Sequence, residues 1–174
     1  MLADDDCIGA GSDRACAGHR ASAPARVELS LCRFHDLDAL SLYQCLQLRS
    51  AVFVLEQQCL YQDIDGADLQ AMHLLVKRQQ QLIGYGRLLP PDNAHSAARI
   101  GRIVIAAGQR GSGHGRWLID LLRACARRQW PGRDIELSAQ THLQELYRRC
   151  GFQPISAPYD EDGISHIDMC WHSE

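Results

Sequence analysis

The sequence lacks long apolar runs and has no strong excess of charge of either sign. No apolar run approaches the roughly 20 residues that a membrane-spanning helix needs. The formal net charge of the 174 residues is −3, so we expect neither a nucleic-acid partner nor attraction to an anionic membrane. The chain begins Met1-Leu2-Ala3 and continues with three aspartates, which places acid where a secretory signal carries base. These absences predict a cytoplasmic protein with no nucleic-acid and no membrane partner.

Closely spaced metal and redox motifs are missing as well. The chain has eight cysteines but no C-x-x-C pair, and most of those after position 30 lie in apolar segments. A free cysteine behaves as a small buried hydrophobic residue, and thiols stay reduced in the cytoplasm. The eight histidines do not supply the short ligand spacings of a zinc site. We therefore expect reduced thiols and no bound metal.

The length and composition fit a single globular domain. Apolar residues make up 46% of the chain and charged residues 22%, which is the balance of a fold that buries its own core. Residues 1–25 are rich in alanine, glycine, serine, aspartate and arginine and show no period, which predicts a disordered leader. From Val27 onward, apolar and polar residues alternate as in a half-buried strand. We predict one folded domain over residues 26–174.

Periodicity further along the chain predicts alternating strands and helices. Strands are predicted at residues 72–77, 82–89, 99–105 and 135–139, and helices after Asp36 or Asp38, at 113–128 and at 143–149. Asp162-Gly163 stands between Tyr159 and the run 164–170, which predicts a hairpin. The order β-α-β-β-β-α-β-α-β-β predicts a mixed α/β fold with one sheet flanked by helices.

A glycine-rich loop at residues 109–115 is the most informative stretch. It leaves an apolar strand, reads Gln109-Arg110-Gly111-Ser112-Gly113-His114-Gly115, and opens an amphipathic helix. Glycines let the backbone approach a ligand closely, and the free amides of a helix start favour a pyrophosphate. The loop lacks the Gly-Lys-Ser/Thr of a P-loop and the spacing of a dinucleotide-binding fingerprint. A simple turn without a ligand remains an alternative.

At this point the sequence resembles the GNAT superfamily of N-acetyltransferases. Arg110-x-x-Gly113-x-Gly115 matches the Q/R-x-x-G-x-G/A coenzyme A loop of that superfamily. Other stretches, from about residue 34 to 170, resemble the bacterial ElaA-like acetyltransferases: Leu48-Arg49-x-x-Val52-Phe53, Asp63-x-Asp65-Gly66-x-Asp68, His73-Leu74, Gly101-Arg102-Ile103-Val104 and Asp160-x-Asp162-Gly163-x-x-His166-Ile167. The resemblance implies a mostly antiparallel sheet with a splayed parallel pair, where coenzyme A lies between the strands of Ile105 and Leu137.

The resemblance also implies the residues that bind acetyl-CoA. They are three strand residues, the glycine loop and two flanking arginines: Ile103, Val104, Ile105, Arg110, Gly111, Ser112, Gly113, His114, Gly115 and Arg116. The strand backbone is expected to pair with the pantetheine arm, and the loop amides with the pyrophosphate. Arg123, Arg127 and Arg128 either approach the 3′-phosphate or form a solvated helix face.

Three residues are candidates for the chemistry. Tyr147 lies in a Y-x-x-x-G-F pattern with Gly151-Phe152, and the resemblance implies that it protonates the departing thiolate; core packing is the alternative. The base is open between Glu56 and His73, with Glu136 a weaker candidate. Arg49, Arg87 and Arg102 lie in apolar elements, where an unpaired charge is costly. We expect them to pair with acids such as Glu56, Asp63 or Asp65.

The function expected from these features is direct acetyl transfer from acetyl-CoA to an amine. The acceptor is a small-molecule amine or an amine of a peptide or protein, and the chain is expected to act as a monomer or homodimer. A route through an acetylated Cys150 is disfavoured, because the sequence places no histidine beside it. Two alternatives stay open. One is a longer acyl donor, since Arg49-x-x-Val52-Phe53 also resembles acyl-homoserine-lactone synthases; the other is a non-catalytic module that binds coenzyme A.

Overall fold

A computed structural model describes residues 27–92 and 96–173. Eight strands form one sheet in the order β1-β2-β3-β4-β5-β8-β6, and β7 pairs with β8. The strands are β1 (Val27–Arg33), β2 (Met72–Arg78), β3 (Gln81–Leu89), β4 (Ala98–Ile105), β5 (Ile135–Gln140), β6 (Gln153–Pro154), β7 (Tyr159–Glu161) and β8 (Ile164–Trp171). Only β4 and β5 are parallel among the described pairs. The predicted mixed fold is confirmed, and the leader lies outside the described residues.

Three α-helices and several tighter turns connect the strands. The helices are α1 (Ala39–Arg49), α2 (His114–Gln129) and α3 (Gln144–Arg149), and α1 continues into the π-helical segment η2 (Ser50–Glu56). Short 3-10 turns are η1 (Phe34–Asp36), η3 (Ala67–Gln70), η4 (Ala107–Gln109) and η5 (Thr141–Leu143). Of the two aspartates predicted to start α1, Asp38 is the cap, because its carboxylate accepts a hydrogen bond from the Ser41 amide at 2.8 Å.

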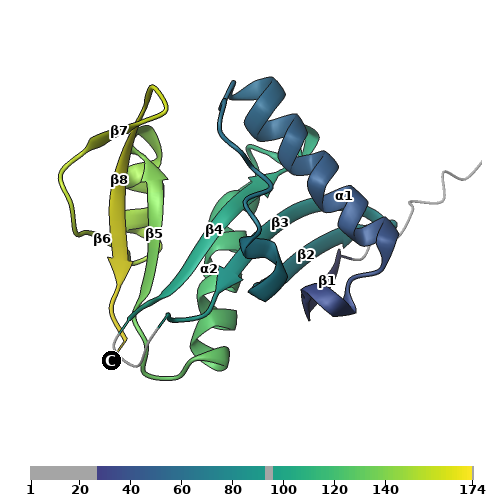
Figure 1. The fold of residues 1–174 in the computed structure, drawn as a ribbon, viewed down its shortest axis with the longest axis horizontal. Helices are drawn as coiled ribbons and strands as arrows, with labels where there is room; N and C mark the ends of the chain where they lie inside the picture. Colours follow the sequence, from purple (N-terminus) through teal and green to yellow (C-terminus); the bar gives the residue numbers. More distant parts are fainter. Residues whose placement is uncertain (1–26, 93–95, 174) are drawn as a thin grey trace, which may run out of the picture.

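Helices α1 and α2 cover opposite faces of the sheet (Figure 1). The alternation of side chains along each strand explains why both faces are apolar. In β2, Leu74 packs in the cluster that contains Leu122 of α2, whereas Leu75 packs in the cluster that contains Cys45 of α1. The middle of the sheet is therefore buried on both sides, as the apolar runs of these strands predict.

Strands β4 and β5 touch only at one end. Their parallel pairing covers Ala98↔Ile135 and Arg99↔Glu136, and the Ala98 amide also donates to the Asp134 carbonyl at 2.9 Å. Beyond that contact the two strands diverge toward the β7 end, and β8 ends at the closed end (Figure 1). The predicted splayed pair is present. It leaves the facing edges of two buried strands without strand partners, which is where a ligand can pair with the backbone.

The structure also bears on the number of strands, the state of the cysteines and the presence of membrane-spanning helices. The strand β6 was not predicted, because its two residues are too short to show a period. The six cysteines of the described region are all free, and Cys45, Cys59, Cys150 and Cys170 are buried. Within residues 27–92 and 96–173, no helix is both long and apolar enough to cross a membrane.

Candidate active site

A cavity of about 550 Å³ lies between the diverging strands. Its walls come from β4, from β5, from the region after α1, and from the β7–β8 hairpin; they include Phe53, Gln57, Arg102, Ile103, Leu137, Ser138, Gln140, Tyr147, Asp162 and His166. The volume is in the range of sites for small organic ligands. At the cavity wall, the Gln140 side-chain amide donates to the Gln57 side-chain carbonyl at 3.2 Å, so a hydrogen bond links the two halves of the sheet.

The β4 wall of this cavity carries a β-bulge. Its register with β3 shifts between Tyr85 and Arg87, and Arg102 has a φ of +52°. A bulge bends the strand and leaves an extra residue outside the ladder. Gly101, Arg102 and Ile103 all line the cavity at this point. The next residue of the predicted pantetheine strand, Val104, buries its side chain on the α1 side.

The glycine loop follows β4 and leads into α2. Gly111 and Gly113 have φ values of +83° and +82°, the left-handed region that glycine adopts without strain. A Cβ atom built at Gly111, Gly113 or Gly115 would meet no heavy atom within 4 Å, so the space beside the loop is open. The first helical bond of α2 runs from the Trp117 amide to the Gly113 carbonyl. The preceding amides of the first turn therefore have no helical acceptor and fit a bound anion.

Two side chains of the loop are fixed by hydrogen bonds. The Nδ1 atom of His114 lies 2.7 Å from the Gln109 carbonyl and 2.8 Å from the Ser112 hydroxyl. Because a carbonyl only accepts, Nδ1 carries a proton and donates to Gln109. Arg116 is exposed and forms a long ion pair with Asp120 at 3.9 Å.

The arginines further along α2 differ in their surroundings, and their approach to the 3′-phosphate stays a prediction. The guanidinium carbons of Arg123 and Arg127 lie 5.7 and 5.1 Å from the centre of the Trp171 ring. Such stacking is a favourable cation–π arrangement. Arg128 is exposed, as a solvated helix face predicts.

Arg110 makes two contacts that join the loop to its surroundings. Its Nε donates to the Ile105 carbonyl at 3.0 Å, and its terminal nitrogens form an ion pair with Glu56. The hydrogen bond from Arg110 holds the pKa of Glu56 below its usual value. The Glu56 carboxylate is therefore ionised, and both of its oxygens are engaged by Arg110. Its expected pairing with a core arginine was wrong, because η2 ends beside the glycine loop.

Tyr147, the predicted proton donor, lies on the wall of the cavity. It is 8% exposed, lines the cavity, and packs edge-to-face against Phe152 at 6.1 Å between ring centres. Its hydroxyl has no hydrogen-bond partner among the residues that the structure describes. Burial, with Cys150 nearby, raises the pKa of Tyr147 to about 12. The group is thus a neutral phenol at physiological pH, with its hydroxyl available to a ligand.

His73 is embedded in the core. Its Nε2 lies 3.0 Å from the Asp68 carbonyl and its Nδ1 lies 2.7 Å from the Tyr85 hydroxyl. Since the carbonyl only accepts, Nε2 carries the proton and Nδ1 accepts from Tyr85. Burial lowers the pKa of His73. Both ring nitrogens are occupied and the residue does not line the cavity, which favours a structural role; Glu136 does not line it either.

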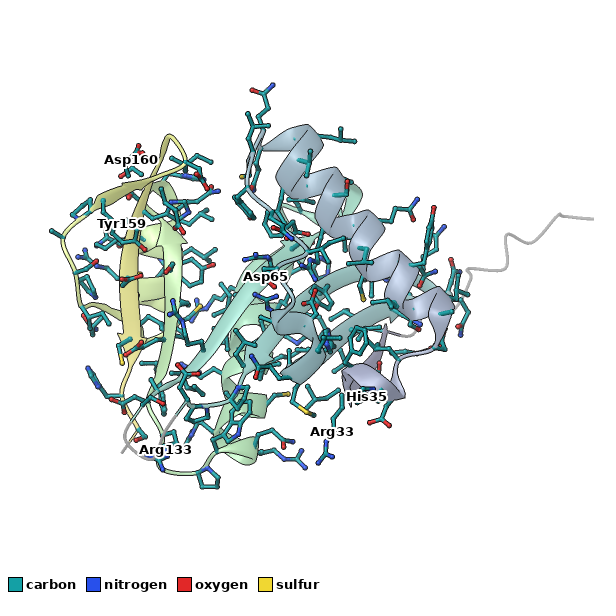
Figure 2. The ribbon with its side chains drawn as sticks, viewed as in Figure 1. Arg33, His35, Asp65, Arg133, Tyr159 and Asp160 are labelled. Atoms are coloured by element: carbon teal, nitrogen blue, oxygen red, sulfur yellow. The ribbon has the colours of Figure 1, made fainter. Side chains whose placement is uncertain are left out.

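A network of three arginines and three aspartates fixes the acid-rich loop onto the sheet. The closest contacts are Arg49–Asp68 at 2.8 Å, Arg87–Asp65 at 2.7 Å and Arg102–Asp63 at 2.7 Å. The expected pairing with Asp63 and Asp65 is confirmed, and Asp68 is an additional partner. Asp65, labelled in Figure 2, lies beside β4 near the centre of the molecule. The network therefore forms one charged wall of the cavity through Asp65, Arg87 and Arg102.

His166 is a cavity residue that the sequence analysis did not select as a base. Its Nδ1 donates to the Ile164 carbonyl at 2.9 Å, and Nε2 has no partner among the described residues. The carboxylate of Glu161 lies 3.8 Å from Nδ1. The signal was present, since His166 ends the Asp160-x-Asp162-Gly163 motif. Only its cross-strand pairing with Gln140 reveals that it faces the cavity.

Comparisons with known proteins agree with this geometry. The sequence matches the family described as "Acetyltransferase (GNAT) domain" over residues 39–173. Protein ElaA of Escherichia coli (strain K12) is 41% identical over 136 residues, which are 77% of this chain and 89% of that protein. The crystal structure of Escherichia coli ElaA matches with a TM-score of 0.79 and 38% identity, covering 86% of this chain and 100% of that chain.

Two further solved structures extend the comparison. An acyl-CoA N-acyltransferase from Pseudomonas aeruginosa is 40% identical with a TM-score of 0.78, covering 83% of this chain and 99% of that one. The AHL synthase LasI is 18% identical with a TM-score of 0.70, covering 86% and 91%, which shows a shared fold alone. The chain therefore belongs to the GNAT acetyltransferase family and is ElaA-like within it.

Proposed function

We propose that this protein transfers the acetyl group of acetyl-CoA directly to an amine. The observation that carries the proposal is the cavity between β4 and β5, with the Tyr147 hydroxyl unpartnered on its wall. The pyrophosphate fits the free amides at the start of α2, and the pantetheine arm fits the unpaired edge of β4 beyond Arg99. This arrangement brings the thioester into the cavity, beside the bulge at Arg102.

Each step of the transfer is assigned to a different group on the cavity wall. A backbone amide of the β4 bulge polarises the thioester carbonyl as a fixed hydrogen-bond donor. His166 accepts the amine proton at Nε2, which is free because Nδ1 donates to Ile164. The amine nitrogen bonds to the carbonyl carbon, the carbon–sulfur bond breaks, and Tyr147 donates to the departing sulfur. Glu161 stabilises the imidazolium that His166 becomes.

The weak acidity of the Tyr147 phenol limits the role that it can play in this reaction. With a pKa of about 12 it is a weaker acid than a thiol, whose reference pKa is about 8.5. A tyrosinate left behind is therefore unfavourable in a buried site. We infer that Tyr147 stabilises the thiolate by a hydrogen bond and keeps its own proton. An acceptor that enters as an ammonium ion gives one proton to His166 before the attack, and the second proton leaves the nitrogen once the carbon–nitrogen bond has formed and ends on the departing sulfur.

The acceptor is proposed by chemical class only. A small-molecule amine or an amine of a peptide reaches the cavity from the side of the β7–β8 hairpin, where Asp162 lies on the wall. The free cysteines of the described region support work in the reducing cytoplasm, as a monomer or homodimer.

A longer acyl donor is the second candidate. The observation in its favour is the cavity volume of about 550 Å³, which holds much more than an acetyl group. Under this alternative the same residues act on the thioester, and the extra volume accommodates the acyl chain in place of a large acceptor.

The test is a matrix of acyl donors and amines followed by thiol release, with products identified by mass spectrometry. We expect acetyl-CoA to give the highest kcat/KM with at least one amine. A maximum at a longer chain length contradicts acetyl transfer and supports the second candidate. Tight binding of acetyl-CoA without turnover over the whole panel contradicts catalysis and supports a coenzyme A binding module.

A further inference from the structure

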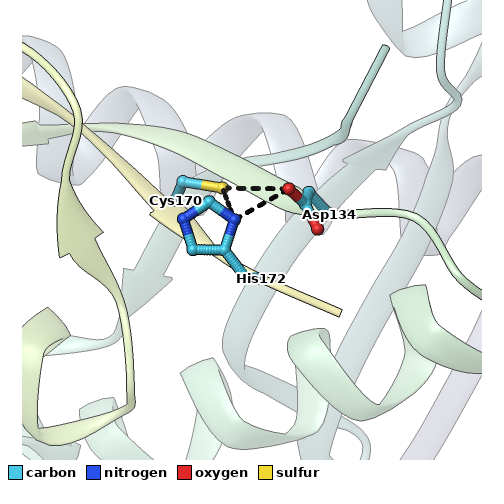
Figure 3. Close-up of side chains that lie close together, drawn as sticks. All are labelled: Asp134, Cys170 and His172. Atoms are coloured by element: carbon cyan, nitrogen blue, oxygen red, sulfur yellow. Dashed lines mark hydrogen bonds and ion pairs between the residues drawn. The ribbon is translucent and has the colours of Figure 1, made fainter. Parts of the chain in front are cut away.

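Asp134, Cys170 and His172 come together at the closed end of the sheet. Cys170 lies in β8, His172 follows two residues later, and Asp134 precedes β5 (Figure 3). None of the three residues lines the cavity. The cluster therefore has no part in the proposed transfer chemistry.

The three ligand atoms are already close to one another. The Cys170 sulfur lies 3.7 Å from Nδ1 of His172 and 3.9 Å from Oδ2 of Asp134, and the latter two atoms are 2.8 Å apart. With the usual zinc bond lengths of about 2.0–2.3 Å, ligand atoms of a tetrahedral site lie roughly 3.3–3.6 Å apart. Small movements bring all three atoms to these spacings.

We propose that Asp134, Cys170 and His172 form a zinc-binding site with water as the fourth ligand. A sulfur, an imidazole nitrogen and a carboxylate oxygen are the ligand types that zinc combines. A thiolate disfavours Mg²⁺ and Ca²⁺, which prefer oxygen ligands. The site thus selects a borderline-soft transition metal.

The electrostatics of the cluster suit a cation. The hydrogen bond from the Ser173 amide, together with His172, holds the pKa of Asp134 below its usual value, so its carboxylate is ionised. Burial, Asp134 and Glu136 raise the pKa of Cys170 to about 11. A bound zinc ion would stabilise the thiolate directly, because it places positive charge next to the sulfur. Zinc binding therefore releases the proton of Cys170, and the proton that Nδ1 of His172 donates to Asp134 moves to Nε2.

The position of the site indicates a structural role. The Asp134 carbonyl accepts a hydrogen bond from the Ala98 amide of β4, and its side-chain carboxylate accepts one from the Ser173 amide after β8. A bound ion would hold the end of β8 to the junction where β4 and β5 meet. His172 is 64% and Asp134 39% exposed, so an ion can reach them without unfolding.

Cobalt and zinc titrations of the full-length, untagged, EDTA-stripped protein test the site. We expect one Co²⁺ per chain at this site with a thiolate-to-cobalt charge-transfer band, displacement by Zn²⁺, and no effect of Mg²⁺. His172→Ala and Cys170→Ser should abolish the band. Because even the supporting partners of a metal ligand contribute about 10–100-fold in affinity, loss of His172 should weaken zinc binding at least that much.

Matched variants separate this site from the other thiols and histidines. His35→Ala and Cys125→Ser change an exposed histidine and a half-buried cysteine elsewhere, and both should bind as wild type does. His172 is largely exposed, so His172→Ala should keep its thermal midpoint without metal. A wild-type protein without the cobalt–thiolate band, or a His172→Ala variant that binds zinc with wild-type affinity, would overturn the proposal.

Discussion

Arg110 donates a hydrogen bond to Glu56 at 3.0 Å and so joins the first arginine of the glycine loop to the end of η2. The sequence predicts different roles for these two residues, cofactor binding for Arg110 and proton transfer from the amine for Glu56. Their ion pair, together with the Arg110–Ile105 hydrogen bond, makes them one unit at the end of β4. Glu56 as a base stays a prediction, and the ion pair favours a role in positioning Arg110.

Replacing Glu56 by Gln separates these roles. The change removes one negative charge beside the loop, so acetyl-CoA should bind slightly more tightly and with a steeper dependence on salt. Turnover should stay within about 3-fold of wild type, whereas loss of a general base typically costs about 10²–10⁴-fold. Calorimetric titration and steady-state rates measure both effects. A loss of turnover in the larger range would identify Glu56 as the base.

Gly115→Asp tests the anion site of the loop. The position is in the first turn of α2 with open space beside it, so the side chain fits. A carboxylate there interacts favourably with the helix dipole, by about 0.3–1 kcal/mol, but repels a pyrophosphate. Thermal-shift titration should show an unliganded midpoint that is unchanged or higher and a stabilisation by acetyl-CoA that is lost.

The control for this charge change is Ala124→Asp, at an exposed position later on the same helix. It should keep the stabilisation by acetyl-CoA. Equal stabilisation of wild type and Gly115→Asp would contradict the loop as the pyrophosphate site.

Tyr147→Phe tests the hydrogen bond from the Tyr147 hydroxyl to the departing sulfur. The variant keeps the ring that packs against Phe152 and removes only the hydroxyl. The affinity for acetyl-CoA should stay within about 3-fold, and the single-turnover rate should fall by about 10²-fold or more. Rapid-quench measurement of the acetylated amine gives this rate without interference from product release. A wild-type rate in the variant would leave Tyr147 with a packing role only.

His166→Gln tests the proposed base. The amide retains polarity but cannot take up the amine proton, so kcat/KM near pH 7 should fall by about 10²–10⁴-fold. The deficit should shrink as the pH rises toward the pKa of the amine, because more acceptor is then already neutral. A pH–rate profile checks this, with His142→Gln as the control at an exposed histidine outside the cavity. A deficit that is independent of pH would argue for a positioning role.

The arginine–aspartate network predicts sensitivity to acid. Hydrogen bonds from Arg87 hold the pKa of Asp65 to about 2, against about 3.9 in an unfolded chain. A depressed pKa in the folded state stabilises the protein above about pH 4, and this contribution is lost as the pH falls toward 2. Urea unfolding across this range should show that decline.

Asp65→Asn is the matched variant for the acid effect. It should lower the free energy of unfolding at pH 7 by about 1–3 kcal/mol, because Arg87 loses charged hydrogen-bond acceptors. Its stability should also decline less steeply than wild type between pH 4 and pH 2. If the free energy of unfolding declined equally steeply with pH in both proteins, Asp65 would not be the group responsible for the acid sensitivity.

Local patterns in the sequence were sufficient for most of the fold. Alternation identified β1, apolar runs between turn residues identified β2, β3 and β4, and the helical period identified α2, because these patterns depend on neighbouring residues. The glycine loop could also be predicted from the sequence. A left-handed backbone at Gly111 and Gly113 favours glycine at those positions. Its match to a known coenzyme A loop then indicated the family.

The pairings across long stretches of chain depended on tertiary structure. Glu56 and Arg110 are 54 residues apart, Gln57 and Gln140 are 83 apart, and Asp134 and Cys170 are 36 apart. No periodic pattern encodes such contacts, because they follow from how strands pair and helices cover them. For this reason the sequence alone identified the glycine loop and Tyr147, whereas the free nitrogen of His166 and the Asp134–Cys170–His172 cluster emerged only when β5 and β8 were placed side by side.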